Sequence, residues 1–275
     1  MLLVHSLHYP LCSTRRTPKN PRFQPLPSSS HPPYLLQFRR SHRQNIKHLK
    51  SLGIAPPSSP ESLDWVLSIV AYLKSKGFSE CHFPRLSFLC PTLFSSSIDP
   101  HLTLSPVFSF LASDLSFSPT QSRDLILWCP KLLVSNVEHR LRPTLLFLRD
   151  LGLKNLDIPT NQNAHLLSTP VEELVSKVRS LEELGFSYEE AGEICARCPA
   201  VFGYSMENNL RPKVDYLVYA MRRSAEEVKK FPQFFGFSLE KRIAPRHLWL
   251  KERGVNISLR RMLLWSDEKF YAKWK

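Results

Sequence analysis

The chain has 275 residues, a formal net charge of +13 and only 8 glycines. This charge favours an anionic partner, and no apolar run in the sequence approaches the roughly 18 residues that a membrane span needs. The glycines form neither a phosphate-binding loop nor a dinucleotide-binding fingerprint. The charge is uneven, because residues 1–60 hold nine Lys/Arg and no Asp/Glu, and residues 206–275 hold 16 basic and 8 acidic residues. Residues 61–205, with 12 basic and 16 acidic residues, are slightly acidic.

Residues 1–38 are rich in Ser, Pro and Arg, contain no acid and show no helical periodicity. This composition is typical of an organellar transit peptide, and the Ser and Pro content favours the plastid over the mitochondrion. The alternative is a basic arm that remains on the protein and binds nucleic acid. We therefore expect a chloroplast transit peptide over 1–38, with the mitochondrion as the alternative destination, and a repeat domain over 39–275.

From Ser62 onward, apolar residues at 63, 66, 67, 70 and 73 recur at helical spacing. The pattern predicts a helix that stops near Gly77, since glycine readily ends a helix.

A motif built on two prolines then recurs along the chain. The prolines stand thirteen residues apart in three copies and fifteen apart in a looser one; the pairs are Pro130 and Pro143, Pro199 and Pro212, Pro232 and Pro245, and Pro91 and Pro106. A fifth copy, around 161–185, lacks the second proline. A repeat of this length is typical of stacked helical units, because no single unit can bury its apolar face alone.

Each unit is predicted to contain two helices. The first ends at the residue before the first proline, since X-Pro disfavours helical geometry at X. The second carries apolar residues at i, i+4 and i+7, and its internal proline should kink it. Serines are good helix N-caps. We expect Ser118, Ser187 and Ser224 to cap first helices, and Ser135, Ser205 and Ser238 to cap second helices.

The CP-x-[VL]-[LF] turn, the proline helix thirteen residues later and the LGFS-type links resemble the mitochondrial transcription termination factor (mTERF) family. The resemblance covers roughly residues 45–275, including the closing segment SLRRMLLWSDEKFYAKW. It implies an all-α superhelix (α-solenoid) with a basic groove, each unit having two antiparallel helices and a short 3₁₀ helix. It also implies a protein that is not an enzyme and that binds organellar double-stranded DNA and/or RNA. Such a protein would act in transcription termination, transcript processing or intron splicing.

Cations recur at equivalent places when the units are aligned on the second proline. The following position reads Thr144, Lys177, Lys213 and Arg246, and the preceding one reads Arg142, Val175, Arg211 and Ala244. We expect the cations to line one face and follow a phosphate backbone; the alternative is a solvated helix face with local ion pairs. The candidate nucleic-acid-binding residues are Arg142, Lys177, Arg211, Lys213, Lys241, Arg242, Arg246, Lys251 and Arg253.

Cys195 and Cys198 form a lone CxxC, which could be a redox pair or half of a zinc site. In other units the place of Cys198 is taken by Cys90, Cys129 and Phe231, which indicates packing. We expect no catalysis, no metal and no cofactor. Two alternatives remain: an α-solenoid scaffold that binds protein partners of an organellar expression complex through the slightly acidic region, and an enzyme built on the CxxC.

Overall fold

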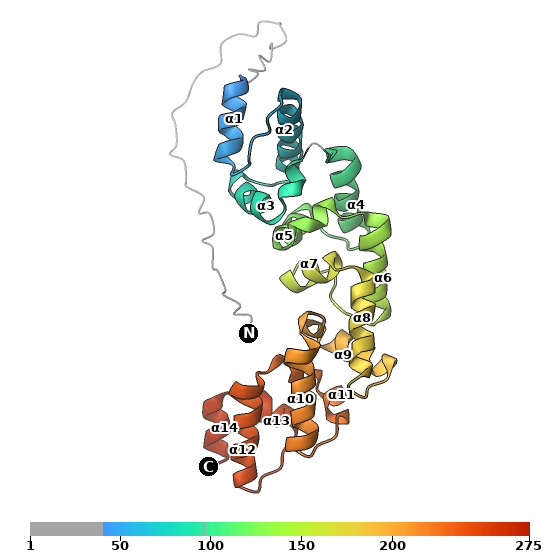
Figure 1. Cartoon of the computed structure of the whole chain (residues 1–275), viewed down its shortest axis with the longest axis vertical. Coiled ribbons are helices and arrows are strands. Elements are labelled where there is room, and N and C mark those ends of the chain that lie inside the picture. Colours follow the sequence, from blue (N-terminus) through green and yellow to red (C-terminus); the bar gives the residue numbers. More distant parts are fainter. Residues whose placement is uncertain (1–40, 96) are drawn as a thin grey trace, which may run out of the picture. The chain divides into compact units, whose positions relative to one another are not determined.

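The computed structural model describes residues 41–95 and 97–275, which belong to one compact unit. These residues form fourteen α-helices and no strand (Figure 1). The prediction of an all-α fold is confirmed. The predicted transit peptide, residues 1–38, lies outside the described residues.

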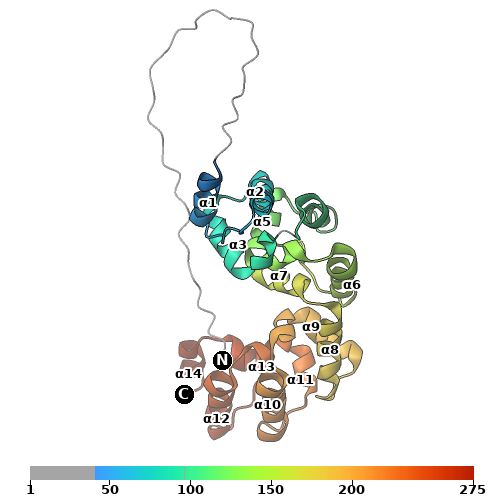
Figure 2. The same cartoon turned by 45° about the horizontal axis from the view of Figure 1, so that its top comes forward.

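The helices follow one another as stacked pairs (Figures 1 and 2). The first helices of the units are α3 (Phe83–Leu89), α5 (Pro119–Trp128), α7 (Asn161–Ser168), α9 (Tyr188–Arg197), α11 (Glu226–Lys230) and α13 (Leu259–Leu264). The second helices are α4 (Ser105–Ser113), α6 (Arg142–Asp150), α8 (Val171–Glu182), α10 (Arg211–Asp215) and α12 (Ala244–Glu252). α1 (His42–Ser51) and α2 (Pro60–Ser75) precede these units, and α14 (Asp267–Lys273) ends the chain. Contacts run between neighbours, with α5 on α7, α6 on α8 and α9 on α11, as expected of a solenoid.

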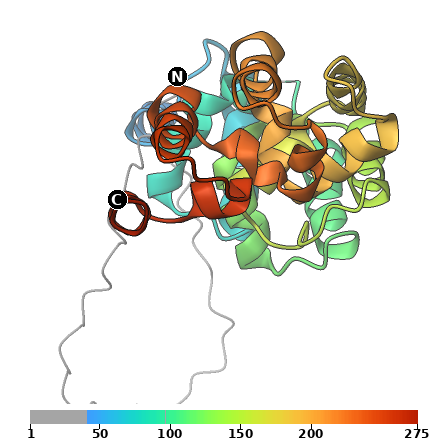
Figure 3. The same cartoon turned by 90° about the horizontal axis from the view of Figure 1, so that it is seen from below.

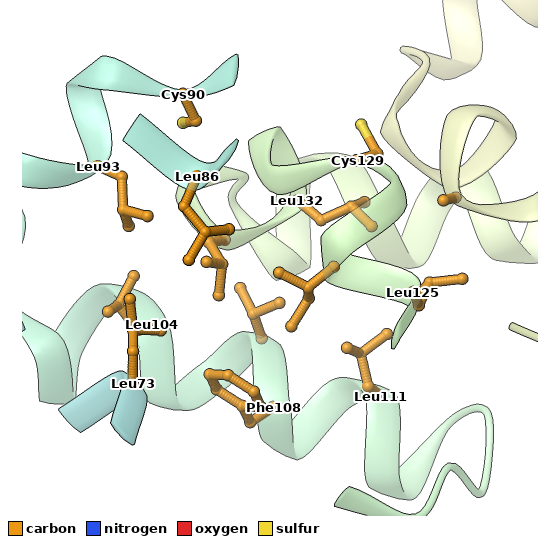
Figure 4. Packing of buried hydrophobic residues seen from close by; sticks show 14 of the residues in the cluster. Leu73, Leu86, Cys90, Leu93, Leu104, Phe108, Leu111, Leu125, Cys129 and Leu132 are labelled. Carbon is orange, nitrogen blue, oxygen red and sulfur yellow. The ribbon is translucent and has the colours of Figure 1, made fainter. Parts of the chain in front are cut away.

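The turn after each first helix has the same backbone in every proline-containing unit. The residue before the proline has φ between −144° and −136° and ψ between 69° and 85°. A 3₁₀ turn follows, namely η2 (Pro91–Phe94), η4 (Pro130–Val134), η6 (Pro199–Gly203) or η9 (Pro232–Gly236). The predicted helix ends before these prolines are confirmed. Figure 4 shows two such turns, where Cys90 and Cys129 lie near the buried Leu93 and Leu132.

A five-residue π-helical turn precedes the second proline of each unit that has one. These turns are η3 (Pro100–Leu104), η5 (Val137–Leu141), η7 (Met206–Leu210) and η10 (Leu239–Ile243). In η7 the Leu210 amide bonds the Ser205 carbonyl five residues back, at 3.0 Å. Proline cannot donate to the helix, and its ring clashes with the carbonyl four residues earlier. The wider turn accommodates it. α8, which lacks the proline, runs without a π-helical turn.

A residue with positive φ follows α2 and the second helices of the units. Gly77, Gly152 and Gly185 have φ of 87°, 85° and 91°, the left-handed geometry that glycine adopts at little cost. The predicted stop at Gly77 is confirmed. In two units a non-glycine takes this place, Ser116 with φ 57° and Arg222 with φ 55°.

The predicted caps are mostly correct. Ser118 and Ser187 accept from the Gln121 and Glu190 amides and form capping boxes. Ser205 and Ser238 cap η7 and η10. The prediction for Ser135 is wrong, because the next residue, Asn136, caps η5 through its bond from the His139 amide. The prediction for Ser224 is wrong by one residue, because Ala225 is the N-cap residue of α11, although the Ser224 hydroxyl accepts from the Glu226 amide at 3.1 Å. An asparagine side chain caps as well as a serine does.

Buried apolar side chains form two clusters that divide within α8. The N-terminal cluster extends from Leu49 to Leu174, and the C-terminal cluster from Val178 to Phe270. Phe147 and Leu151 pack against both. Figure 4 shows part of the first cluster, and Figure 3 views the chain with the C-terminal helices in front. The core is therefore continuous along the stack but built from neighbour-to-neighbour packing.

Candidate nucleic-acid interface

The position after the second proline forms a row of contacts between units. The Thr144 hydroxyl donates to the Thr169 carbonyl at 3.1 Å, and Lys177 Nζ donates to the Tyr204 carbonyl at 2.7 Å. Lys213 Nζ donates to the Phe235 carbonyl at 2.6 Å, and Arg246 Nη1 to the Met262 carbonyl at 2.6 Å. Each acceptor lies in the next unit, so these four side chains form what we call the clamp row.

Lys213 is the most enclosed lysine of the clamp row. Its side chain is 5% exposed, and its ammonium also donates to Asn209 Oδ1 at 2.7 Å. It lies 5.5 Å from the centre of the Tyr204 ring. Burial lowers the pKa of Lys213 to about 8, with the Glu240 carboxylate acting in the opposite direction. Lys213 therefore lies in the interior and not on the exposed face that the sequence pattern suggested.

Arg246 is enclosed even more completely, at 1% exposure. Its Nη2 reaches the Trp265 carbonyl at 2.8 Å and Asp267 Oδ1 at 2.5 Å, and its guanidinium lies 4.5 Å from the Phe270 ring centre. The hydrogen bond from Arg246 lowers the pKa of Asp267. The structure thus uses Arg246 to tie α13 and α14 to α12, and this side chain is likewise absent from the predicted face.

Two arginines before the second proline form inter-unit ion pairs. Arg142 Nη2 lies 3.6 Å from Asp114 of the preceding unit and 3.4 Å from Glu138 on its own helix. Arg211 repeats the arrangement with Glu183 at 2.6 Å and Glu207 at 3.8 Å. The side chains are 42% and 34% exposed. Their charge is therefore shared with two acids each, although solvent and a ligand can still reach them.

Arg242 and Arg253 lie over aromatic rings. Arg242 is half-buried, lies 5.5 Å from the Phe237 ring centre and donates to the Trp265 carbonyl at 2.7 Å. Arg253 lies 3.4 Å from the Trp249 ring centre and 3.4 Å from the Glu252 carboxylate. Both guanidiniums are held in place by these contacts.

Lys241 and Lys251 are the two predicted residues whose side chains are exposed and make no hydrogen bond or ion pair among the described residues. The same part of the chain holds further exposed cations without such partners, at positions outside the predicted set: Arg222, Lys230, Arg260, Arg261, Lys269, Lys273 and Lys275. Of these, Arg222 and Lys251 lie at one depression of the surface.

That depression, which we call the C-terminal groove, lies between η8 (Tyr216–Ala220) and α12 and has a volume of ≈ 610 Å³. A smaller hollow of ≈ 210 Å³ shares some of its lining. The groove is lined by Tyr216, Tyr219, Ala220, Met221, Arg222, Ala244, His247, Leu248 and Lys251. The Tyr216 hydroxyl and His247 Nδ1 are 3.0 Å apart, whereas Tyr219 is 69% exposed. Burial, with Lys251 and Arg223, lowers the pKa of His247.

The CxxC is part of the core. Cys195 and Cys198 are buried, and burial raises the pKa of Cys195 to about 12. A thiol with such a pKa stays protonated and is a poor nucleophile and metal ligand. Within the described residues, no group of three His, Cys, Asp or Glu side chains is placed to hold a metal ion. None of the described helices is both long and apolar enough to cross a bilayer.

Comparison with known proteins agrees with the repeat architecture. The chain is 32% identical over 97 residues to a protein of Arabidopsis thaliana named transcription termination factor MTERF2, chloroplastic. Those residues are 35% of this chain but 15% of that protein, so the chain spans only a small part of its relative. The profile of the mTERF family matches residues 103–271, which include the clamp row, the proline turns η4, η6 and η9, and the π-helical turns η5, η7 and η10. A match over more than half of the residues, on a stack of proline-marked helical units, means that this chain belongs to the mTERF family.

Proposed function

We propose that this protein binds organellar nucleic acid and regulates organelle gene expression, without catalysis, in transcription termination, transcript processing or intron splicing. The family membership and the name of the Arabidopsis relative support this role. The observation that carries the proposal is the set of exposed cations without acidic partners in the C-terminal third. They are Arg222, Lys230, Lys241, Lys251, Arg260, Arg261, Lys269, Lys273 and Lys275.

Affinity in this proposal comes from phosphate contacts made by the exposed cations. Lys241 and Lys251 contact phosphates directly, and Arg142, Arg211, Arg242 and Arg253 contribute from their partly neutralised positions. Lys177, Lys213 and Arg246 act indirectly, because their hydrogen bonds to the next unit fix the spacing of the helices that carry the other cations. Phosphate contacts of this kind position a polymer and carry no sequence information themselves.

The test is a binding titration of the full chain against duplex DNA and single-stranded RNA, measured by fluorescence anisotropy at about 50 and 200 mM salt. The logarithm of the binding constant should fall with the logarithm of salt, by about 0.9 per phosphate on duplex and about 0.7 on a single strand. The preferred polymer indicates termination or RNA processing. Salt-independent binding would contradict the phosphate mechanism.

Charge reversal locates the interface. Lys241→Glu with Lys251→Glu should lower affinity at least tenfold. The matched control is Lys131→Glu with Lys154→Glu, which changes net charge equally at two exposed lysines outside the C-terminal third. Equal losses in both double variants would mean that net charge alone, and not the C-terminal surface, determines affinity.

A scaffold function is the second candidate. Phe88 and Leu102, in the slightly acidic region, are 85% and 81% exposed, and exposed apolar side chains are common at protein interfaces. A scaffold would bind neither polymer in the titration. It would instead co-purify with an organellar protein, and the double variant Phe88→Ser with Leu102→Ser would lose that protein.

We also propose that the protein acts in the chloroplast, with the mitochondrion as the alternative. The acid-free N-terminal composition and the chloroplastic relative support this placement. Imaging of the full chain fused at its C-terminus to a fluorescent protein tests it, and a cytosolic signal would contradict both destinations.

A further inference from the structure

We infer that the C-terminal groove is a subsite for one unpaired nucleotide of a single-stranded nucleic acid. The base lies against Tyr219, and the neighbouring phosphate lies between Arg222 and Lys251. This inference rests on the proposed function and narrows it, because it assigns a base-contacting residue and a preference for unpaired strand.

The groove has a suitable size and lining for this ligand. Its ≈ 610 Å³ falls within the roughly 300–1,000 Å³ of small-molecule sites. One wall is η8 with Tyr216 and Tyr219, and the other is α12 with His247, Leu248 and Lys251. Among its described lining residues there is no Asp or Glu, so an anion entering the groove meets only cations and neutral groups.

Tyr219 offers a free ring face. It is 69% exposed, and Leu248, which also lines the groove, is 51% exposed. By contrast, the Tyr216 ring meets His247 edge-on, with the ring centres 5.6 Å apart, and shares a hydrogen bond with it. Tyr216 and His247 therefore form a fixed wall, while Tyr219 is available for stacking. Stacking on an aromatic ring tolerates any base, because every base has a π-face.

Arg222 holds an unusual backbone conformation at the mouth of the groove. Its φ of 55° is the left-handed geometry that Gly152, Gly185 and Gly254 adopt at the ends of their helices. Left-handed geometry is unfavourable for a residue with a Cβ, and strained residues of this kind cluster at ligand sites. The side chain is exposed and makes no hydrogen bond or ion pair with any described residue. Its guanidinium is therefore free to bind an anionic ligand at the groove.

His247 can read the edge of the base. Burial and the nearby Lys251 and Arg223 lower its pKa, so the imidazole is neutral at physiological pH. Its Nδ1 faces the Tyr216 hydroxyl, and its Nε2 has no hydrogen-bond partner in the described structure. A neutral ring nitrogen can donate to or accept from a base, depending on its tautomer.

We assign the ligand as a single strand because the faces of its bases are accessible, whereas the base faces of a duplex are stacked on one another. In a duplex both faces of a base are stacked on neighbours, so contact with Tyr219 would require the base to leave the stack. An unpaired strand presents its bases without that cost.

The experiment compares the full chain with Tyr219→Ala, Tyr219→Phe and Arg222→Ala. The probes are a fluorescein-labelled single-stranded RNA and a duplex DNA of the same sequence. Tyr219→Ala should weaken RNA binding about tenfold and leave duplex binding within about twofold. Tyr219→Phe should bind RNA like the parent, since it keeps the ring. Arg222→Ala should weaken RNA binding and reduce the salt slope by about 0.7.

Two outcomes separate the subsite from the proposed function. If the parent shows salt-dependent binding but Tyr219→Ala binds RNA equally well, the subsite is wrong and the proposed function stands. The same holds if Tyr219→Ala weakens RNA and duplex binding by equal factors. If the parent binds neither polymer, both fail together. Tyr219 is largely exposed, so the variants should fold, and circular dichroism verifies this.

Discussion

The ammonium of Lys213 lies 2.6 Å from the carbonyl oxygen of Phe235, in the next helical unit. A residue that resembles a phosphate ligand in sequence is therefore an internal tie between units. Thr144, Lys177 and Arg246 make the equivalent bond in their own units. The clamp row, and not a surface stripe, is the reason why polar side chains recur after the second proline.

Replacing Lys213 should destabilise the protein. Lys213→Ala leaves the Phe235 carbonyl without its donor and opens space where the stem was packed, so we expect a loss of about 2–4 kcal/mol in the free energy of unfolding. Lys241→Ala, at an exposed lysine, should change it by less than about 0.5 kcal/mol. Urea denaturation of the full chain measures both. A loss below about 0.5 kcal/mol for Lys213→Ala would show that the Lys213 contact of the clamp row contributes little to stability.

Stability should rise with pH through the titration of Lys213. Its folded pKa of about 8 lies below the ordinary 10.5, so between these values the unfolded state binds more protons than the folded state. The free energy of unfolding should therefore increase from pH 8 to pH 10.5, on the order of 1–3 kcal/mol, relative to Lys213→Met. Denaturation at several pH values across this window measures the difference. A difference that stays constant or falls would contradict the depressed pKa, and Lys241→Met serves as the flat control.

Arg222→Gly should separate folding from binding. Glycine removes the cost of the left-handed backbone, so the variant should be as stable as the parent or up to about 1 kcal/mol more stable. It should nevertheless bind single-stranded RNA more weakly, because the guanidinium is gone. Thermal unfolding and anisotropy measure the two effects. A less stable variant would mean that Arg222 supports the fold.

The buried thiols should react slowly. With a pKa of about 12, the buried Cys195 holds almost no thiolate at pH 8 and is shielded from the reagent. Iodoacetamide at pH 8 should therefore label the exposed Cys81 at least about a hundredfold faster than Cys195. Peptide mapping by mass spectrometry distinguishes the sites, and denaturant should remove the difference. Comparable rates in the native protein would revive the interpretation of the CxxC as a reactive pair.

The positions of helix ends could be predicted because proline acts locally. Pro130, Pro199 and Pro232 end the preceding helices wherever the rest of the chain lies. The burial of Lys213 and its hydrogen-bond acceptor could not be predicted in this way, because both depend on the backbone of the next unit. Alignment shows that equivalent side chains point in the same direction but not whether solvent or a neighbour lies there. Thr144, at the position equivalent to Lys213, indicates in the sequence that this position is internal, since an uncharged hydroxyl favours an internal hydrogen bond over a phosphate contact.

The C-terminal groove could not be predicted from the sequence for a different reason. Its lining comes from a unit with one extra residue, in which Leu217 and Arg222 are five apart while Leu148 and Gly152 are four apart. η8 absorbs this residue as a π-helical turn, with the Met221 amide bonded to the Tyr216 carbonyl at 3.0 Å. The missing helix-ending glycine could not mark the groove, because Ser116 takes the same place in another unit. The side chains that meet in the groove depend on packing.

The division of the core within α8 has a thermodynamic consequence. Leu174 belongs to one apolar cluster and Val178 to the other, so we expect the described residues to unfold as two blocks that share a single helix. The C-terminal groove and the unpaired cations lie entirely in the second block. A nucleic acid bound there stabilises only the block that it contacts. Calorimetry with saturating ligand would then show one transition moving to higher temperature while the other stays in place, and the ligand would convert a single melting event into two.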